Sequence, residues 1–140
     1  MMSSRSASSE PDERTVARER ALHLLYEAEV KAVDGREVVL AQPLEVDALA
    51  RGIVDGVATH RDDLDGRISA HLVGWTLQRM PLIDKIVLRM ATFELLERPE
   101  TPTAVILNEA VELAKRFSTD ESPRFVNGVL ASLAREIRRD

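Results

Sequence analysis

The sequence predicts an all-α fold of about six or seven helices. Apolar residues recur at helical spacing along the chain, no segment alternates like a half-buried strand, and proline, glycine and acidic residues mark the expected helix ends. At 140 residues with 44% apolar content, the chain suits one domain with a substantial core. We expect a disordered polar tail over residues 1–11 and a single helical domain over residues 12–140.

The first helix is expected over residues 12–32, where alanine and leucine residues form an apolar stripe. Tyr26 lies about 150° from the centre of that stripe, on the polar side of the helix. A tyrosine there is often an ordinary surface residue, but it can also offer a ring on which a base stacks. Spacing alone favours the first interpretation. Residues 33–44 contain Gly35 and Pro43, which predict a connection with at most a short turn.

A second helix is expected over residues 45–60, where Gly52 and Gly56 fall on one face. Because glycine lacks a side chain, this face predicts a close approach to another helix. A third helix is expected to begin at the acidic pair 62–63, which suits the helix dipole. Its apolar stripe is expected to continue to Trp75, with the preceding glycine ending the helix.

The segment 82–96 is the most apolar helix that the sequence predicts. A break over residues 77–81 precedes it, and Pro81 opens it. Its apolar residues go most of the way round the helix, which is typical of a helix wrapped by others. We therefore expect this segment at the centre of the fold.

The last two helices are expected on either side of a short polar break at residues 118–122. Phe125 lies about 100° from the apolar stripe of the second one, at the edge of its buried face. Asn127 and Gly128 form a turn-like pair inside the helical pattern. In one interpretation Phe125 is a packing residue and Gly128 lets another helix come close. In the other, the ring is an aromatic platform beside three cations: Lys115, Arg116 and Arg124.

Residue types that carry catalysis or bind metals are absent or scattered in this sequence. There is no cysteine, the histidines (His23, His60 and His71) lack metal-type spacing, and no glycine-rich phosphate loop occurs. We therefore expect no catalytic residue, no metal site and no cofactor. No apolar run is long enough to span a membrane, and residues 1–10 lack the apolar core of a signal peptide. These features favour a cytoplasmic protein.

Charge is distributed unevenly along the chain. The net charge of −5 argues mildly against a nucleic-acid binder, since such proteins usually carry a basic surface. Residues 31–114 carry nine basic and fourteen acidic side chains, whereas residues 115–140 carry six basic and four acidic ones. A small basic surface with an aromatic ring suits a few nucleotides of single strand. From the residues alone, RNA binding is one option of several.

Three blocks of sequence carry a resemblance to a known family. They are RERALHLLYEAE, IVLRMATFELL and AVILNEAVELAKRFSTDESPRFVNGVL, in this order between about Arg14 and Ile137. Together they resemble the NusB family, and ISAHLVGWTLQRMPLIDKIVLR resembles its actinobacterial branch. The resemblance implies an all-α fold of two crossed helical subdomains. It also implies a transcription antitermination factor that binds boxA RNA together with NusE, a small-subunit ribosomal protein. Such a complex helps RNA polymerase to read through terminators in ribosomal RNA operons.

The resemblance also implies which residues contact RNA. The family uses an arginine-rich start of the first helix, the tyrosine on that helix and the phenylalanine of the FVNG segment. The expected RNA-binding residues of this chain are Arg14, Arg18, Tyr26, Lys115, Arg124, Phe125 and Asn127. The chain departs from the family where Thr15 and Val16 interrupt the arginine tract. Fewer phosphate contacts predict weaker binding and a shallower dependence on salt.

Two hypotheses of different classes follow. The first is an RNA-binding antitermination factor. The second is a helical protein-interaction module with little RNA affinity of its own, acting through NusE or through self-association. Some actinobacterial relatives form homodimers that cover the RNA face, so a homodimer is an expected partner state under the second hypothesis. The interrupted arginine tract is the feature that favours it.

Overall fold

The computed structural model describes residues 12–138, so the tail expected over residues 1–11 lies outside the described part of the chain. Within residues 12–138 there are α-helices, one short 3-10 helix and no strand, which confirms the all-α class. No helix in this range combines the length and the apolar character that crossing a bilayer requires. In chain order the elements are α2 (Glu13–Lys31), α3 (Gly35–Leu40), α4 (Ala48–Thr59), α5 (Arg61–Ser69), η1 (Leu77–Arg79), α6 (Leu82–Glu97), α7 (Thr103–Phe117) and α8 (Ser122–Ile137).

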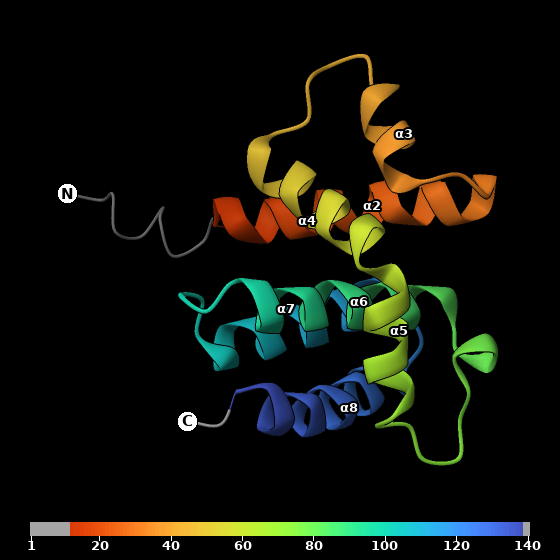
Figure 1. The fold of residues 1–140 in the computed structure, drawn as a ribbon, viewed down its shortest axis with the longest axis vertical. Helices are drawn as coiled ribbons and strands as arrows, with labels where there is room; N and C mark the ends of the chain where they lie inside the picture. The colour runs from red at the N-terminus through yellow and green to blue at the C-terminus, as the bar shows by residue number, and fades with distance from the viewer. Residues whose placement is uncertain (1–11, 139–140) are drawn as a thin grey trace.

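The helices form two groups that meet at α6 (Figure 1). The first group consists of α2, α3 and α4, which pack on one another. In the second group α6, α7 and α8 pack on one another, with α5 against α6 and α8. In Figure 1, α2 lies above α6, α7 and α8, while α3 and α5 run across the direction of these long helices. The two crossed helical subdomains expected from the resemblance are both present.

The central helix is α6, as its apolar composition predicts. It contacts α2 and α4 of the first group and α5, α7 and α8 of the second, and every residue from Ile86 to Leu95 is buried. Helix α4 approaches it closely at Gly56, where a Cβ would lie 2.2 Å from the ring of Phe93. A residue with a side chain would force this ring or the helix to shift. The expected close helix–helix approach is thus confirmed at Gly56.

The C-terminal end of α6 is closed by a residue from the far end of the domain. The guanidinium of Arg138 donates to the main-chain carbonyl oxygens of Glu94, Leu95, Arg98 and Thr101 over distances of 2.6–3.2 Å. The last turn of a helix leaves carbonyl groups without intrahelical partners. One side chain therefore caps α6 and ties the end of α8 to it.

Residues 33–44 are more ordered than the sequence predicts, because six of them form α3. Asp34 is the N-cap of this helix. Its carboxylate accepts hydrogen bonds from the backbone N–H of Arg36 at 2.8 Å and from its guanidinium at 2.6 and 2.9 Å. Gly35 is buried, and a Cβ there would lie 3.0 Å from the Val54 side chain on α4. The cap and the close approach to α4 together explain why a short helix replaces the expected connection.

Helix α5 ends at Ser69, earlier than the apolar stripe predicts. Just beyond it, the ring of His71 lies between the Ser132 hydroxyl, at 2.6 Å, and the Glu136 carboxylate, at 2.5 Å, both on α8. The chain leaves the helix to make these contacts. Trp75 therefore lies outside any helix and its side chain is 52% exposed. The prediction that Trp75 continues a buried stripe is wrong.

Candidate nucleic-acid interface

The turn between α7 and α8 is held against the start of α6 by a buried carboxylate. Asp84 is 2% exposed and accepts hydrogen bonds from the hydroxyls of Ser118 at 2.6 Å and Ser122 at 2.9 Å. Ser122 begins α8, and Pro123 follows in the first turn, where the missing N–H would have no intrahelical partner. This network fixes where α8 starts, and so it fixes the position of Phe125 three residues later.

Phe125 packs partly into the core and contacts Trp75 from the segment between α5 and η1. The two ring centroids are 5.9 Å apart and the ring planes are tilted by 55°. Gly74, with a φ of 77°, makes a turn before Trp75 and does not end α5, which is a further difference from the prediction. The sequence did hold a signal for Trp75. Gly74 directly precedes it, and a glycine can break a helical pattern, so Trp75 need not continue the buried face of α5.

The surface of α8 next to Phe125 is open. Gly128 follows Phe125 by three residues, on the same side of the helix, and nothing lies within 4 Å of the Cβ that it lacks. Its interpretation as a point of close helix approach is therefore wrong. Asn127 is also exposed, but it lies about 200° round the helix from Phe125 and so points to another side.

The exposed side of α2 continues this surface across the end of α7. His23 meets Phe117 edge to face, with ring centroids 5.1 Å apart. Arg116 donates to Glu19 at 2.8 Å and lies over the Phe117 ring, 4.8 Å from its centroid. Tyr26 follows His23 by three residues, so it shares the same face of α2, and it is 42% exposed. Tyr26 thus continues the exposed face of α2 one helical turn beyond His23.

A row of five rings therefore runs from the exposed face of α2, past the α7–α8 turn, to the segment before η1. We call them the aromatic arc: Tyr26, His23, Phe117, Phe125 and Trp75. Figure 1 shows the C-terminal half of α2, the start of α6 and the start of α8 toward the same end of the molecule. Lys115 and Arg124, on either side of the turn, are exposed and form no ion pair with another residue in the range 12–138. The structure thus brings Tyr26, Lys115, Arg124 and Phe125 to one end of the fold.

The two arginines of α2 that are expected to bind RNA, Arg14 and Arg18, lie in different environments. Arg18 is 5% exposed and donates to both carboxylate oxygens of Glu94, at 2.8 and 2.9 Å, with Glu109 at 3.5 Å. The hydrogen bonds that Arg18 donates to Glu94 hold the pKa of Arg18 above its ordinary value. The expectation that Arg18 lies on an RNA surface is corrected, since it joins α2 to α6 in the interior. Nothing near Arg18 in the sequence points to a partner 76 residues further along the chain.

Arg14 remains exposed in the first turn of α2, beside a cavity of about 390 Å³. Twelve residues separate it from Tyr26, or about 18 Å along the helix axis. Arg14 therefore lies apart from the aromatic arc. A ligand that touched both would have to extend along α2.

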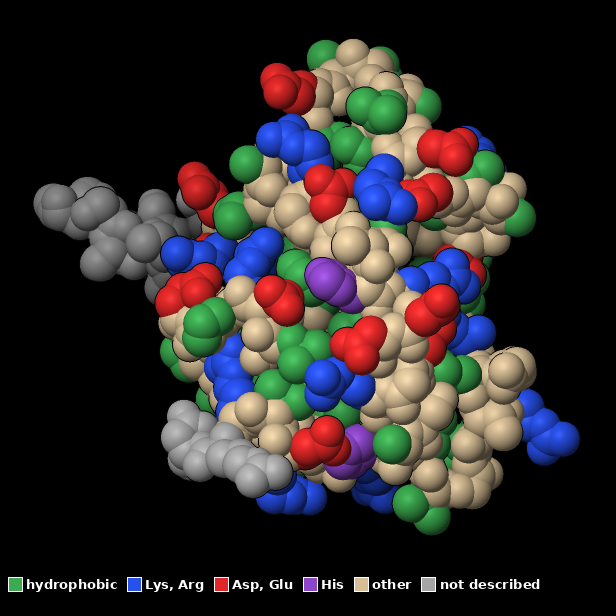
Figure 2. Space-filling view, in the orientation of Figure 1, with side chains coloured by type: hydrophobic (Ala, Val, Ile, Leu, Met, Phe, Trp, Pro, Cys, Tyr) green, Lys and Arg blue, Asp and Glu red, His purple; other side chains and the backbone are tan. Residues whose placement is uncertain are grey.

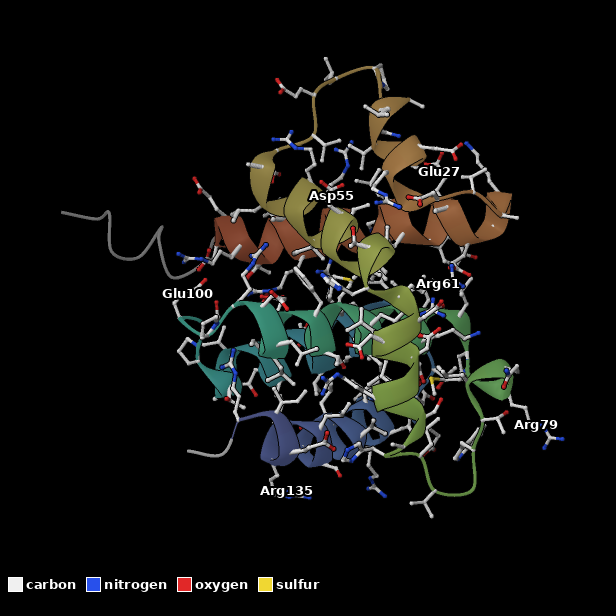
Figure 3. The ribbon with its side chains drawn as sticks, viewed as in Figure 1. Glu27, Asp55, Arg61, Arg79, Glu100 and Arg135 are labelled. Carbon is white, nitrogen blue, oxygen red and sulfur yellow. The ribbon has the colours of Figure 1, made fainter. Side chains whose placement is uncertain are left out.

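Elsewhere the surface charges largely pair with one another. On the face seen in Figure 2, basic and acidic side chains are interspersed over α4, α5 and α7. Arg61, labelled in Figure 3 at the start of α5, forms an ion pair with Glu29 at 2.9 Å. A neutralised surface of this kind gives no field that would attract phosphates. The aromatic arc with its unpaired cations is accordingly the candidate interface.

The fold and this surface define a helical binding protein. No group of side chains within residues 12–138 could hold a metal ion. The chain matches the family described as the NusB family over residues 15–135, and it belongs to that family. The transcription antitermination protein NusB of Acidothermus cellulolyticus is 48% identical over 124 residues, covering 86% of each chain. The protein is thus a transcription antitermination factor and not an enzyme.

Solved structures agree with this assignment. NusB of T. maritima has a TM-score of 0.81 and is 33% identical, with 91% of this chain and 94% of that chain covered. A structure of antitermination factors NusB and NusE in complex with dsRNA has a TM-score of 0.75, covering 88% of this chain and 96% of that chain. Its identity is 24%, so this likeness concerns the fold alone.

Proposed function

We propose that this protein binds boxA-type single-stranded RNA together with NusE, and so promotes read-through by RNA polymerase in ribosomal RNA operons. The activity is assigned to the cytoplasm, within the antitermination complex of the polymerase. One observation carries the proposal: the aromatic arc lies beside exposed cations that have no carboxylate partner within the described range. Rings stack on unpaired bases, and cations neutralise the phosphates between them. The assembly of NusB with NusE and RNA named above is consistent with these partners.

The proposed contact residues are the members of the expected set whose side chains are exposed or partly exposed. They are Arg14, Tyr26, Lys115, Arg124, Phe125 and Asn127. Arg18 is left out because its guanidinium is buried against Glu94. Single-stranded RNA suits the surface better than a duplex, since a half-exposed ring can stack only on a base that is not already stacked.

The number of free cations bounds the affinity. Arg14, Lys115 and Arg124 are the exposed basic members of the contact set. Each phosphate contact with a single strand contributes a slope of about −0.7 in a plot of log affinity against log salt, so three contacts give about −2. We therefore expect the isolated protein to bind RNA weakly, with an affinity that falls only gradually as the salt concentration rises. NusE should raise the affinity by adding contacts.

The test is a binding titration with three RNAs: a boxA-type strand, a scrambled strand of the same length and a duplex of the boxA sequence. Each is measured with and without NusE at two salt concentrations. Phe125→Ala should cost about 1–3 kcal/mol of binding to the boxA-type strand, the range for loss of a stacking ring. The control is Leu40→Ala, which trims an apolar side chain that is 85% exposed at the end of α3, away from the arc.

Two outcomes oppose this proposal. The first is a Phe125→Ala variant that melts like a core deletion and keeps its RNA affinity, because the ring would then be a packing residue only. The second is a wild-type protein that prefers the duplex to the single strand. Both unfolding and binding must therefore be measured for each variant.

A helical protein-interaction module is the alternative function. It is favoured by the fact that Arg18, which the family resemblance assigns to RNA, and Arg116, beside Phe117, are already paired with Glu94 and Glu19. In that case the protein binds NusE, or a second copy of itself as a homodimer, without useful RNA affinity. Light scattering of the isolated protein measures self-association. NusE binding without any gain in RNA affinity would favour the module over the RNA-binding factor.

A further inference from the structure

Trp75 is an unusual surface residue in this chain. It is the single tryptophan, it belongs to no helix, and half of its side chain is exposed although the fold has a large core. The turn at Gly74 and the contact with Phe125 hold it at the surface. Packing into the core does not explain why such a large ring lies at the surface.

We propose that Trp75 is a second stacking residue of the RNA surface, which with Phe125 receives an unpaired base of a single strand. This inference rests on the proposed function. The rings meet at 55° and not face to face, so their mutual contact covers less of the indole face than parallel stacking would. The exposed part of the indole extends the aromatic arc beyond α8 to the segment before η1.

The surroundings of Trp75 favour a nucleic acid over a protein partner. Arg79 follows it by four residues and extends from η1 into solvent (Figure 3). Arg124 immediately precedes Phe125 and is also exposed. Neither arginine pairs with a carboxylate of the described residues, so both are available to contact phosphates of a bound strand. A protein-binding tryptophan is instead expected inside an apolar patch with few free charges. Val73, two residues before Trp75, is the exposed apolar neighbour in this segment, so a protein contact is an outcome that the experiment below must separate.

The experiment uses Trp75 as its own reporter, because no other tryptophan contributes to the emission. A boxA-type oligonucleotide is titrated into the full chain in the presence of NusE, and tryptophan emission is followed beside the fluorescence anisotropy of the labelled RNA. A NusE variant without tryptophan keeps the signal specific. We expect quenching that saturates together with the anisotropy change, as a base stacks on the indole.

Variants separate stacking from simple proximity. Trp75→Ala should weaken RNA binding by about 5- to 150-fold, the range for losing a base–aromatic stack. Trp75→Phe keeps a ring against Phe125 and should retain most of the affinity. The matched control is Val73→Ala in the same segment, whose side chain is 90% exposed, and it should leave the affinity unchanged. Thermal unfolding of each variant shows whether packing has changed.

The outcomes distinguish this inference from the function on which it rests. RNA binding with unchanged emission, and with wild-type affinity in Trp75→Ala, overturns the stacking role and leaves the proposed function standing. Absence of RNA binding by the wild-type complex overturns the proposed function itself. Emission that changes on adding NusE alone, or on concentrating the isolated chain, and does not change further with RNA, assigns Trp75 to a protein contact and overturns the inference.

Discussion

The buried ion pair between Arg18 and Glu94 offers the sharpest test of how α2 is used. Arg18→Met keeps most of the apolar stem and removes the guanidinium, so the Glu94 carboxylate, 2% exposed, loses both of its hydrogen bonds from Arg18. Breaking a buried pair from one side costs about 3–5 kcal/mol. Domains of this kind are stable by about 5–15 kcal/mol in total. The variant should therefore lie close to the limit of stability.

Two further variants test whether the cost of Arg18→Met comes from the burial of the ion pair. Replacing both partners, as Arg18→Met with Glu94→Leu, removes the unpaired charge and should recover most of the loss, since apolar replacements of buried pairs are often neutral. Arg116→Ala breaks an exposed ion pair of similar length to Glu19, and it should cost at most about 1 kcal/mol. The Arg18–Glu94 and Arg116–Glu19 ion pairs have similar lengths, so the difference in cost measures the effect of burial.

The assay is urea and thermal unfolding followed by far-UV circular dichroism, with RNA titration beside it. For a domain of this size, each kcal/mol lowers Tm by about 3–5 °C, so Arg18→Met should lose on the order of 10–20 °C. The double variant should bind RNA like the wild type. If Arg18→Met instead unfolds at the wild-type temperature and binds RNA as poorly as Phe125→Ala, Arg18 is a phosphate contact and its interior role is refuted.

Three further predictions concern glycines and one helix cap. Gly56→Ala should destabilise the fold by about 1–3 kcal/mol in urea unfolding, because its Cβ would lie 2.2 Å from a buried ring; a variant as stable as the wild type would mean that this ring moves freely. Gly128→Ala and Gly66→Ala both enter open space in helices and should each stabilise by about 0.5–1 kcal/mol, yet only Gly128→Ala should weaken RNA binding; equal affinities would place the RNA elsewhere. Asp34→Asn keeps the cap of α3 but loses the Arg36 guanidinium, which, with the Arg36 backbone N–H, lowers the pKa of Asp34 from 3.8 to about 2. A lowered pKa stabilises the fold above pH 3.8, and this effect is lost as the pH falls through about 2. The variant should therefore be less stable than the wild type at neutral pH, by at most about 1 kcal/mol for an exposed pair, and equally stable near pH 2.

Features that depend on local sequence could be predicted. The central position of α6 follows from apolar residues on nearly all of its sides, and that pattern is complete within the segment 82–96. The contact at Gly56 also follows from spacing on one helix. In contrast, α3 is only six residues long, so its pattern is too short to separate from the turn residues around it.

The errors at the candidate site have a different cause. The environment of Arg18 is set by Glu94, 76 residues further on, and nothing near Arg18 in the sequence announces this partner. Trp75 continues the apolar spacing of α5, but this spacing does not predict where the helix ends. The end of α5 is set by the contacts of His71 with α8. Exposure of Tyr26 and Phe125, which depends mainly on their own helices, agreed with their angular positions. Long-range pairing is thus what sequence reasoning lacked.

The hydrogen bonds of Arg138 have a consequence for how the chain folds as it is made. Glu94 accepts hydrogen bonds from Arg18 through its carboxylate and from Arg138 through its carbonyl oxygen. One residue of the central helix therefore has hydrogen-bond partners near both ends of the domain. The second partner emerges from the ribosome 44 residues after Glu94. Until then α6 lacks this cap, and until residues 122–137 have emerged it also lacks the packing of α8, so its apolar sides are exposed. We expect the nascent domain to reach its protease-resistant state only once residue 138 has left the exit tunnel.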